Sequence, residues 1–228
     1  MRTRTKVVLA VGGSVLVLGG VAFAVGPGIY ADHVNSQAAA PPRIAAAGER
    51  DPLPATDLPG EWTVGAGSFA GYRVDEVLRG HRATVTGRTE QVTGDLTVTG
   101  DQLTAADITV DVAGIATPEA ARDAYFRSSV MDTDRFPQAT FELTSPAPVS
   151  AVTGGRPGEV PVTGELTIHG VTRQVSTTLQ AAANGDGAQV TGSVPITFAD
   201  YGVTAPRLPF VSVEDTGQVE FSLHLERG

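Results

Sequence analysis

The side chains best suited to acid–base chemistry in this sequence are four histidines, and none stands in a known catalytic pattern. The chain contains no H-E-x-x-H, G-x-S-x-G or phosphate-binding G-x-x-x-x-G-K-[ST] motif. His33 lies in an Ala/Pro-containing segment, and His81 follows a glycine in an expected turn. His224 falls on the outward parity of an expected strand. His169 precedes Gly170, so we interpret it as a turn residue that tolerates positive φ rather than as a metal ligand or base.

Paired carboxylates are the second group that could do chemistry. Asp132 with Asp134, and Glu214 with Asp215, have the spacing of acid–base pairs, but such residues more often lie in solvated turns. Asp200 closes an expected strand and is interpreted as a turn cap. The absence of cysteine excludes disulfides, thiolate catalysis and cysteine-ligated metals. We therefore expect a protein that is not an enzyme and has neither a metal site nor a cofactor, although a triad assembled from distant strands stays open.

The stretch G-E-L-T-I-H-G-V-T-R, residues 164–173, indicates how the chain is organised. Apolar residues alternate with polar ones before it and through it, which is typical of a half-buried strand. If His169-Gly170 is a two-residue turn, antiparallel pairing places Ile168 opposite Val171 and Leu166 opposite Arg173. Arg173 then lies on the apolar parity near a turn, where a barrel would have its rim.

Similar alternation recurs through the rest of the domain, interrupted by one short helix. Strands are predicted at residues 68–76, 82–87, 91–99, 106–112, 139–144, 159–169, 173–181, 189–198 and 218–226. Thr117-Pro118-Glu119 resembles a helix start and predicts a helix over residues 120–126. Antiparallel strands with one apolar face are accommodated by a closed barrel or a two-sheet sandwich. The sequence thus predicts an all-β domain at residues 59–228.

The first thirty residues have the composition of an export segment. Arg2, Arg4 and Lys6 precede an uncharged, largely apolar run over residues 7–30, long enough for a membrane helix of about 20 residues. We expect residues 1–30 to be a signal-anchor that holds an extracytoplasmic domain at the cell membrane. The alternative is a signal peptide cleaved near Ala24, but the apolar run continues past that residue.

Residues 31–58 are Ala/Pro-rich and weakly hydrophobic, so we predict a disordered linker between the membrane segment and the domain. The formal net charge is −9, with every acidic residue after residue 31. Such a surface would repel phosphates, which argues against a nucleic-acid partner. The sequence carries no signal for an oligomeric state.

Several separated motifs carry a family resemblance. These are an early Trp62, Gly87-Arg88-Thr89, Arg122-Asp123, the F-P-Q-A-T-F run at residues 136–141, and the hairpin at residues 164–173. With them the chain resembles the YceI-like family, whose members are lipocalin-like barrels that bind polyisoprenoids. The resemblance implies an antiparallel lipocalin-like β-barrel of about eight strands with one short helix. It also implies an isoprenoid ligand, a polyprenyl lipid or a quinone tail.

The inward positions of such a barrel favour aliphatic residues over large aromatics, so the interior is expected to be underfilled and able to take an apolar ligand. The predicted lining residues of the tail site share the inward parity: Val92, Leu96, Phe141, Leu166, Ile168, Val175, Val194, Phe221 and Leu223. Arg173 and Arg122 are candidates for contact with the ligand headgroup. A structural tie between the short helix and the barrel end is the alternative for Arg122. A structural or protein-interaction module and a lipid-modifying enzyme are the alternative functions.

Overall fold

The computed structural model describes residues 26–44, 53–153, 156–185, 187–209 and 211–228. The elements follow in the order α2 (Pro27–Gln37), η1 (Ala55–Asp57), β1 (Gly60–Val64), β2 (Phe69–Leu78), β3 (His81–Thr89), β4 (Val92–Thr99), β5 (Gln102–Asp111), α3 (Ala120–Tyr125), η2 (Phe126–Val130), β6 (Gln138–Ser145), β7 (Ala147–Pro148), η3 (Ser150–Thr153), β8 (Gly158–Ile168), β9 (Val171–Asn184), β10 (Gly187–Thr197), η4 (Phe198–Tyr201), β11 (Arg207–Leu208) and β12 (Val211–Arg227). The expected signal-anchor lies almost wholly at residues 1–25, outside the described residues. None of the described helices is long and apolar enough to cross a membrane.

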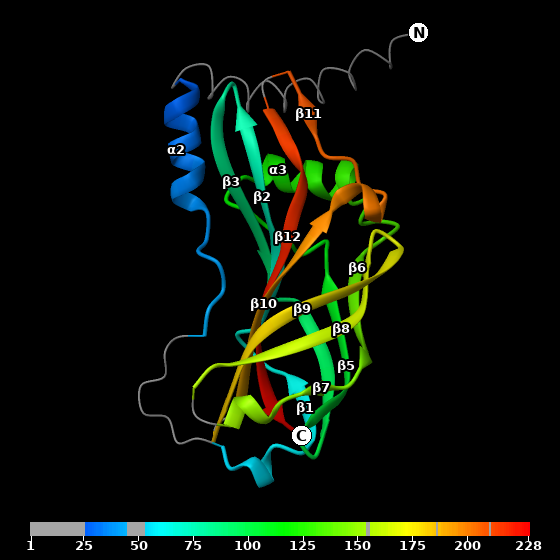
Figure 1. Cartoon of the computed structure of the whole chain (residues 1–228). Coiled ribbons are helices and arrows are strands. Elements are labelled where there is room, and N and C mark those ends of the chain that lie inside the picture. The colour runs from blue at the N-terminus through cyan, green and yellow to red at the C-terminus, as the bar shows by residue number, and fades with distance from the viewer. Residues whose placement is uncertain (1–25, 45–52, 154–155, 186, 210) are drawn as a thin grey trace.

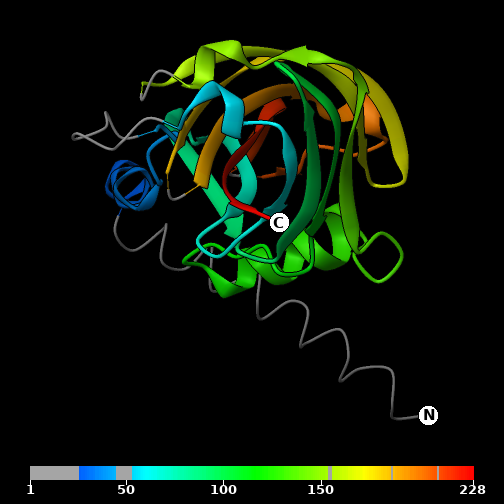
Figure 2. The ribbon, with the colours of Figure 1, turned by 90° about the horizontal axis from the view of Figure 1, so that it is seen from below.

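Eight antiparallel strands close into a ring, which confirms the predicted all-β barrel. The order around the ring is β1-β4-β5-β6-β8-β9-β10-β12, and β12 pairs with β1 to complete it. Figure 2 shows the strands arranged in a ring when the molecule is seen from below. The lower half of β12 contacts β1, whereas its upper half pairs with β2, so the β2–β3 hairpin extends the wall upward from the ring (Figure 1).

The predicted hairpin between β8 and β9 is confirmed pair by pair. Ile168 lies opposite Val171, and Leu166 lies opposite Arg173. The turn residues His169 and Gly170 have φ values of 52° and 73°. Two consecutive positive φ angles belong to the type I′ turn, whose twist matches that of the strands it joins.

The strand predictions missed β1, because its five residues around Trp62 are too short to show clear alternation. They also began β12 too late, at residue 218. That strand begins at Val211, and its register shifts between Val213 and Gly217. The shift breaks the period of two that sequence reasoning depends on.

The structure corrects the expectation of a disordered linker over residues 31–58. α2 extends to Gln37 and lies against the outside of β3 (Figures 1 and 2). Its Tyr30, Ala31 and Val34 are buried in a small apolar cluster that also contains Leu78, Ala83 and Val85. Three apolar residues spaced along one helical face have enough surface to dock a short helix, although the segment is Ala/Pro-rich as a whole.

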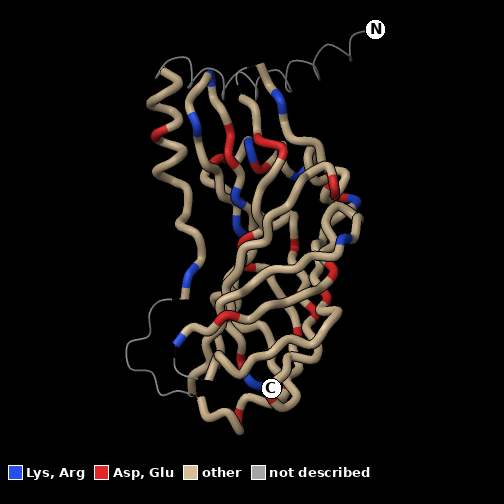
Figure 3. Tube along the Cα trace, in the orientation of Figure 1, with Lys and Arg blue, Asp and Glu red and all other residues tan. Residues whose placement is uncertain are grey.

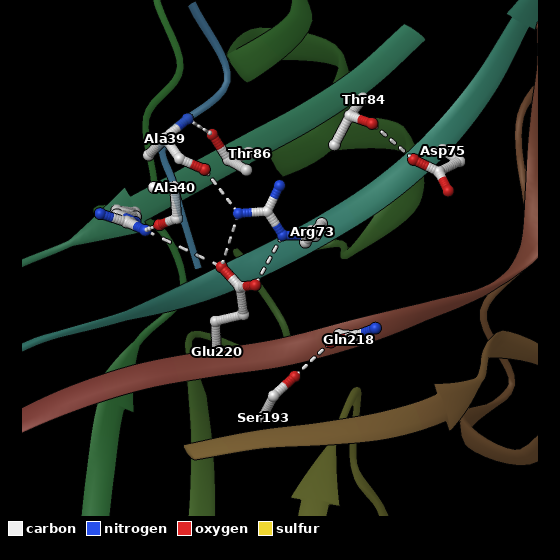
Figure 4. Close-up of polar contacts among 10 residues, drawn as sticks. Ala39, Ala40, Arg73, Asp75, Thr84, Thr86, Ser193, Gln218 and Glu220 are labelled. Atoms are coloured by element: carbon white, nitrogen blue, oxygen red, sulfur yellow. Dashed lines mark hydrogen bonds and ion pairs between the residues drawn. The ribbon is translucent and has the colours of Figure 1, made fainter. Parts of the chain in front are cut away.

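Residues 38–44, which we call the strap, descend from α2 along the outer wall (Figure 1). The amide of Ala39 donates to the Thr86 hydroxyl at 2.9 Å, and the carbonyl of Ala39 accepts from Arg73 (Figure 4). The carbonyl of Ala40 accepts from Arg88 at 2.8 Å. These bonds supply an extended backbone with partners that it would otherwise find in water.

The predicted short helix is present as α3, followed directly by η2, a single turn of π-helix. Thr117 does not cap α3 in the expected way. Instead its amide and hydroxyl both donate to the buried carboxylate of Asp123, at 3.0 and 2.8 Å. Asp123 therefore fixes the loop that enters the helix. The helix lies across the upper part of the molecule, behind β2 and β12 in Figure 1.

Candidate ligand cavity

The barrel encloses a cavity of about 750 Å³, within the range of small-molecule sites in proteins. Its wall is built mainly from aliphatic and aromatic side chains on the inward parity of the strands. Two apolar clusters form it, and Phe221 packs against both. Acidic and basic residues are instead interspersed along the length of the molecule (Figure 3). The cavity therefore offers a largely apolar volume inside the barrel.

Most of the predicted tail-site residues line this cavity: Leu96, Phe141, Leu166, Ile168, Val194, Phe221 and Leu223. Val92 does not line it, although it is buried in the same apolar cluster as Leu96. Val175 does not line it either and is only partly buried against the second cluster. The only tryptophan of the chain, Trp62, does line it, and its indole Nε1 donates to the Leu58 carbonyl at 3.1 Å.

One end of the cavity is polar. Glu76 of β2 and Arg122 of α3 both line it, with 3.4 Å between Oε1 and Nη2. Their side chains are 6% and 20% exposed, so the pair is largely withdrawn from water. Tyr30 of α2 and Tyr72 of β2 line the same end, and the charge of Arg122 is near enough to lower the pKa of each phenol against the effect of burial. Residues from three separate elements thus meet at one place.

The electrostatics of this end follow from burial. Burial raises the pKa of Glu76, and the positive charge of Arg122 opposes that rise. Burial raises the pKa of Tyr72 to about 12, again against the effect of Arg122. It also raises the pKa of Tyr30. Both phenols therefore stay protonated through the physiological range and can act as hydrogen-bond donors.

Tyr72 is held rigidly in this site. Its ring stacks on Phe126, with 5.1 Å between the ring centroids and 25° between the planes. A side chain in place of Gly87 on the neighbouring strand would come within 2.6 Å of the Tyr72 ring. Within the described chain, its hydroxyl makes no hydrogen bond. A fixed donor that faces a cavity without a protein partner is available to a ligand.

The two predicted headgroup residues are placed differently. Arg122 lines the cavity, as a headgroup contact requires, and its ion pair with Glu76 also ties α3 to the barrel, as the structural interpretation requires. Arg173 lies on the inward parity as expected, but its side chain is exposed and does not line the cavity. It is close enough to the lining residue Tyr201 to oppose the burial-driven rise in the pKa of that phenol. A headgroup role for Arg173 stays a prediction.

Sequence reasoning missed Glu76, Tyr72 and Tyr30. Glu76 and Tyr72 lie on the same face of β2 as Ala70 and Val74. An acidic residue on the apolar face of a predicted strand was therefore the signal in the sequence that could have identified this site. Tyr30 carried no such signal, because it precedes the domain and its position depends on the docking of α2.

The histidines and paired carboxylates lie away from the cavity. The His169 ring contacts Phe136 at the β8–β9 turn, 4.5 Å between centroids, and His224 points outward from β12. Asp215 forms an exposed ion pair with Arg207. Across the described residues, no group of three or more His, Asp or Glu could hold a metal ion.

Comparison with known proteins identifies the family of this domain. The pattern of the YceI-like domain matches residues 62–225. A UPF0312 protein of Shewanella sp. (strain ANA-3) is 32% identical over 130 residues, 52% of this chain and 64% of that protein. A UPF0312 protein of Shewanella baltica (strain OS185) is 29% identical over 128 residues with the same coverage. The chain thus spans 64% of the length of these curated relatives.

Two solved structures share the fold. A polyisoprenoid binding domain from Saccharophagus degradans, implicated in plant cell wall breakdown, superposes with a TM-score of 0.59 at 20% identity, covering 73% of this chain and 98% of that one. BcnA of Burkholderia cenocepacia superposes with a TM-score of 0.54 at 23% identity, covering 67% and 95%. At these identities the likeness shows the fold alone.

Proposed function

Because the chain belongs to the YceI-like family, we propose that it is a non-catalytic binding protein that holds an isoprenoid lipid in its barrel. The observation that carries this proposal is the cavity of about 750 Å³ with an almost wholly apolar wall. A cavity of this kind suits a flexible hydrocarbon tail, which needs little directional bonding. The polyisoprenoid binding domain of Saccharophagus degradans supports the same ligand class.

The energetics are favourable for a tail of a few isoprene units. Burial contributes about 0.8 kcal/mol per CH₂ removed from water. That gain has to exceed the cost of immobilising the ligand, which is several kcal/mol and depends weakly on tail length. Longer tails are therefore expected to bind more tightly until the cavity is full. None of the described lining residues pairs a nucleophile with a base, so the lipid would be held unchanged.

The direct test combines extraction and titration. Mass spectrometry of organic extracts of the purified protein should find a co-purifying isoprenoid. After the ligand has been removed, titration with a polyprenol should change the fluorescence of Trp62, because this residue lines the cavity. An extract without isoprenoid, followed by no saturable fluorescence change, would contradict the proposal.

Substitution tests whether the tail lies inside the barrel. Leu166→Asp or Phe221→Asp should abolish binding, since each introduces a charge into the apolar wall. Thr178→Asp, on the exposed face of β9, is the matched control and should bind normally. Saturable binding by a folded Phe221→Asp protein would place the ligand elsewhere.

We also propose that the barrel is extracytoplasmic and held at the membrane by the part of the predicted segment 1–30 that precedes α2, with cleavage near Ala24 as the alternative. The basic start and the uncharged run over residues 7–30 support this topology. Protease added to intact spheroplasts should digest the barrel. A protected barrel would contradict export, whereas a soluble exported protein beginning at Val25 would favour cleavage.

A further inference from the structure

We propose that the polar end of the cavity selects an uncharged headgroup, one with a hydrogen-bonding oxygen such as a quinone carbonyl or a polyprenol hydroxyl, over a diphosphate. The selecting residues are Glu76, Arg122, Tyr30 and Tyr72. This inference rests on the proposed function and adds the class of headgroup to it.

The charges at this end are balanced. Among the described lining residues, Glu76 has the only carboxyl group and Arg122 the only basic side chain, and they are paired at 3.4 Å. A diphosphate that approached Arg122 would also approach the Glu76 carboxylate, which is withdrawn from water. Like charges repel strongly in such surroundings, and separating the pair would leave a buried carboxylate without its partner. The site therefore disfavours anions although it contains an arginine.

The same end is rich in donors that need no compensating charge. Arg122 has five N–H groups, of which the bond to Glu76 uses one on Nη2. Tyr72 presents a hydroxyl without a protein partner, on a ring fixed by Phe126. An uncharged oxygen can accept from these donors while the ion pair stays intact.

Tyr30 contributes to this end from outside the matched domain. It lies on α2, before the matched domain at residues 62–225, yet it lines the cavity and lies close enough to Arg122 for that charge to oppose the rise in its pKa. The strap holds α2 in place through the bonds of Ala39 and Ala40 to the outer wall (Figure 4). A segment outside the family domain thus completes the polar end.

The test uses three probes of equal tail length in the same detergent: a polyprenol, a prenylated quinone and a polyprenyl diphosphate. Affinities for the full chain come from the fluorescence of Trp62. We expect both uncharged probes to bind at least about tenfold more tightly than the diphosphate. Equal or tighter binding of the diphosphate would overturn the inference while leaving the proposed function standing. If none of the three binds, the proposed function fails and takes the inference with it.

Glu76→Gln should shift the affinity ratio toward the diphosphate by about tenfold or more, because it frees Arg122 from its counter-charge. Asp75→Asn is the matched control, since Asp75 lies one residue away on the same strand, bonds to Thr84 outside the barrel and does not line the cavity (Figure 4). It should leave the ratio unchanged. An unchanged ratio in Glu76→Gln, or the same shift in Asp75→Asn, would overturn the inference.

Tyr72→Phe provides a test that leaves the ion pair and the ring stacking in place. It should weaken both uncharged probes about fivefold, the loss expected for one hydrogen bond, and leave a hydrocarbon of equal length unaffected. An equal loss for the hydrocarbon would mean that Tyr72 only packs against the tail. That result would remove Tyr72 from the headgroup site and overturn the proposal as stated.

Discussion

Arg73 and Glu220 form a buried ion pair on the outer face of the barrel wall, with 2.6 Å between Nε and Oε1 (Figure 4). The Glu220 side chain is 2% exposed, although its neighbour Phe221 is the residue that points into the cavity. Arg88 approaches the same carboxylate at 3.8 Å and also lies over the Phe69 ring. The strap covers this cluster and supplies backbone carbonyls to Arg73 and Arg88, while the buried Nε of Arg88 has no hydrogen-bond partner among the described residues. The outside of the wall is therefore buried there as well.

Removing Glu220 should destabilise the protein strongly. We expect Glu220→Ala to lower the free energy of unfolding by about 3–5 kcal/mol, because two arginines lose their buried partner. Asp215→Ala breaks an exposed pair with Arg207 and should cost at most about 1 kcal/mol. Denaturant unfolding measures both. Similar small losses in the two variants would show that the Arg73–Glu220 pair contributes little.

The docking of α2 can be tested on the helix itself. Val34→Asp places a charge in the cluster with Leu78 and Val85, so α2 should detach and the strap should become sensitive to limited proteolysis. Ile29→Asp is the control, because Ile29 is 63% exposed on the same helix. A strap that is equally resistant in both variants would contradict the docked arrangement.

The β8–β9 turn depends on a residue without a side chain. Gly170→Val should cost roughly 1 kcal/mol or more, because φ is 73° and a Cβ would lie 2.5 Å from the Phe136 ring. Gly185→Val, where a Cβ would meet nothing within 4 Å, should cost much less. Thermal unfolding compares them. Unchanged stability in Gly170→Val would argue against the type I′ turn.

The buried phenol of Tyr72 predicts a loss of stability in alkali. The folded protein keeps this proton up to about pH 12, whereas the unfolded chain loses it near pH 10. The unfolded state therefore binds fewer protons in that interval, and the free energy of unfolding should fall by roughly 2–3 kcal/mol as the pH rises through it. Denaturant unfolding from pH 9 to 12 should show this fall in the wild type and a smaller one in Tyr72→Phe. Equal falls in the two proteins would contradict the buried titration.

The periodic part of the fold could be predicted from the sequence because each strand carries its own signal. Leu166 and Ile168 alternate with polar residues, and the following His-Gly pair fixes the register through a turn of known geometry. This local rule also placed Phe221 and Leu223 correctly in the cavity wall. Where a strand shifts register, as β12 does between Val213 and Gly217, the rule stops working.

The polar end could not be predicted in the same way, because it depends on contacts between distant segments. Glu76 and Arg122 meet only when α3 is laid over β2, and Tyr30 joins them only because the strap holds α2. Arg173 illustrates the converse case. Its parity was correct, but parity does not report how far a side chain lies from the open end of a barrel.

The closure of the ring determines when the barrel can finish folding, because it needs the last strand of the chain. β1 meets β12 through the pairs Trp62–Arg227, Thr63–Glu226 and Val64–Leu225, so the first and last strands of the ring seal each other. A ribosome releases β1 long before it has made Leu225. Until then the apolar interior has an open side, and pairing over so large a sequence separation is slow. The nascent barrel is therefore most prone to aggregation, and most accessible to a lipid, before its last strand is in place.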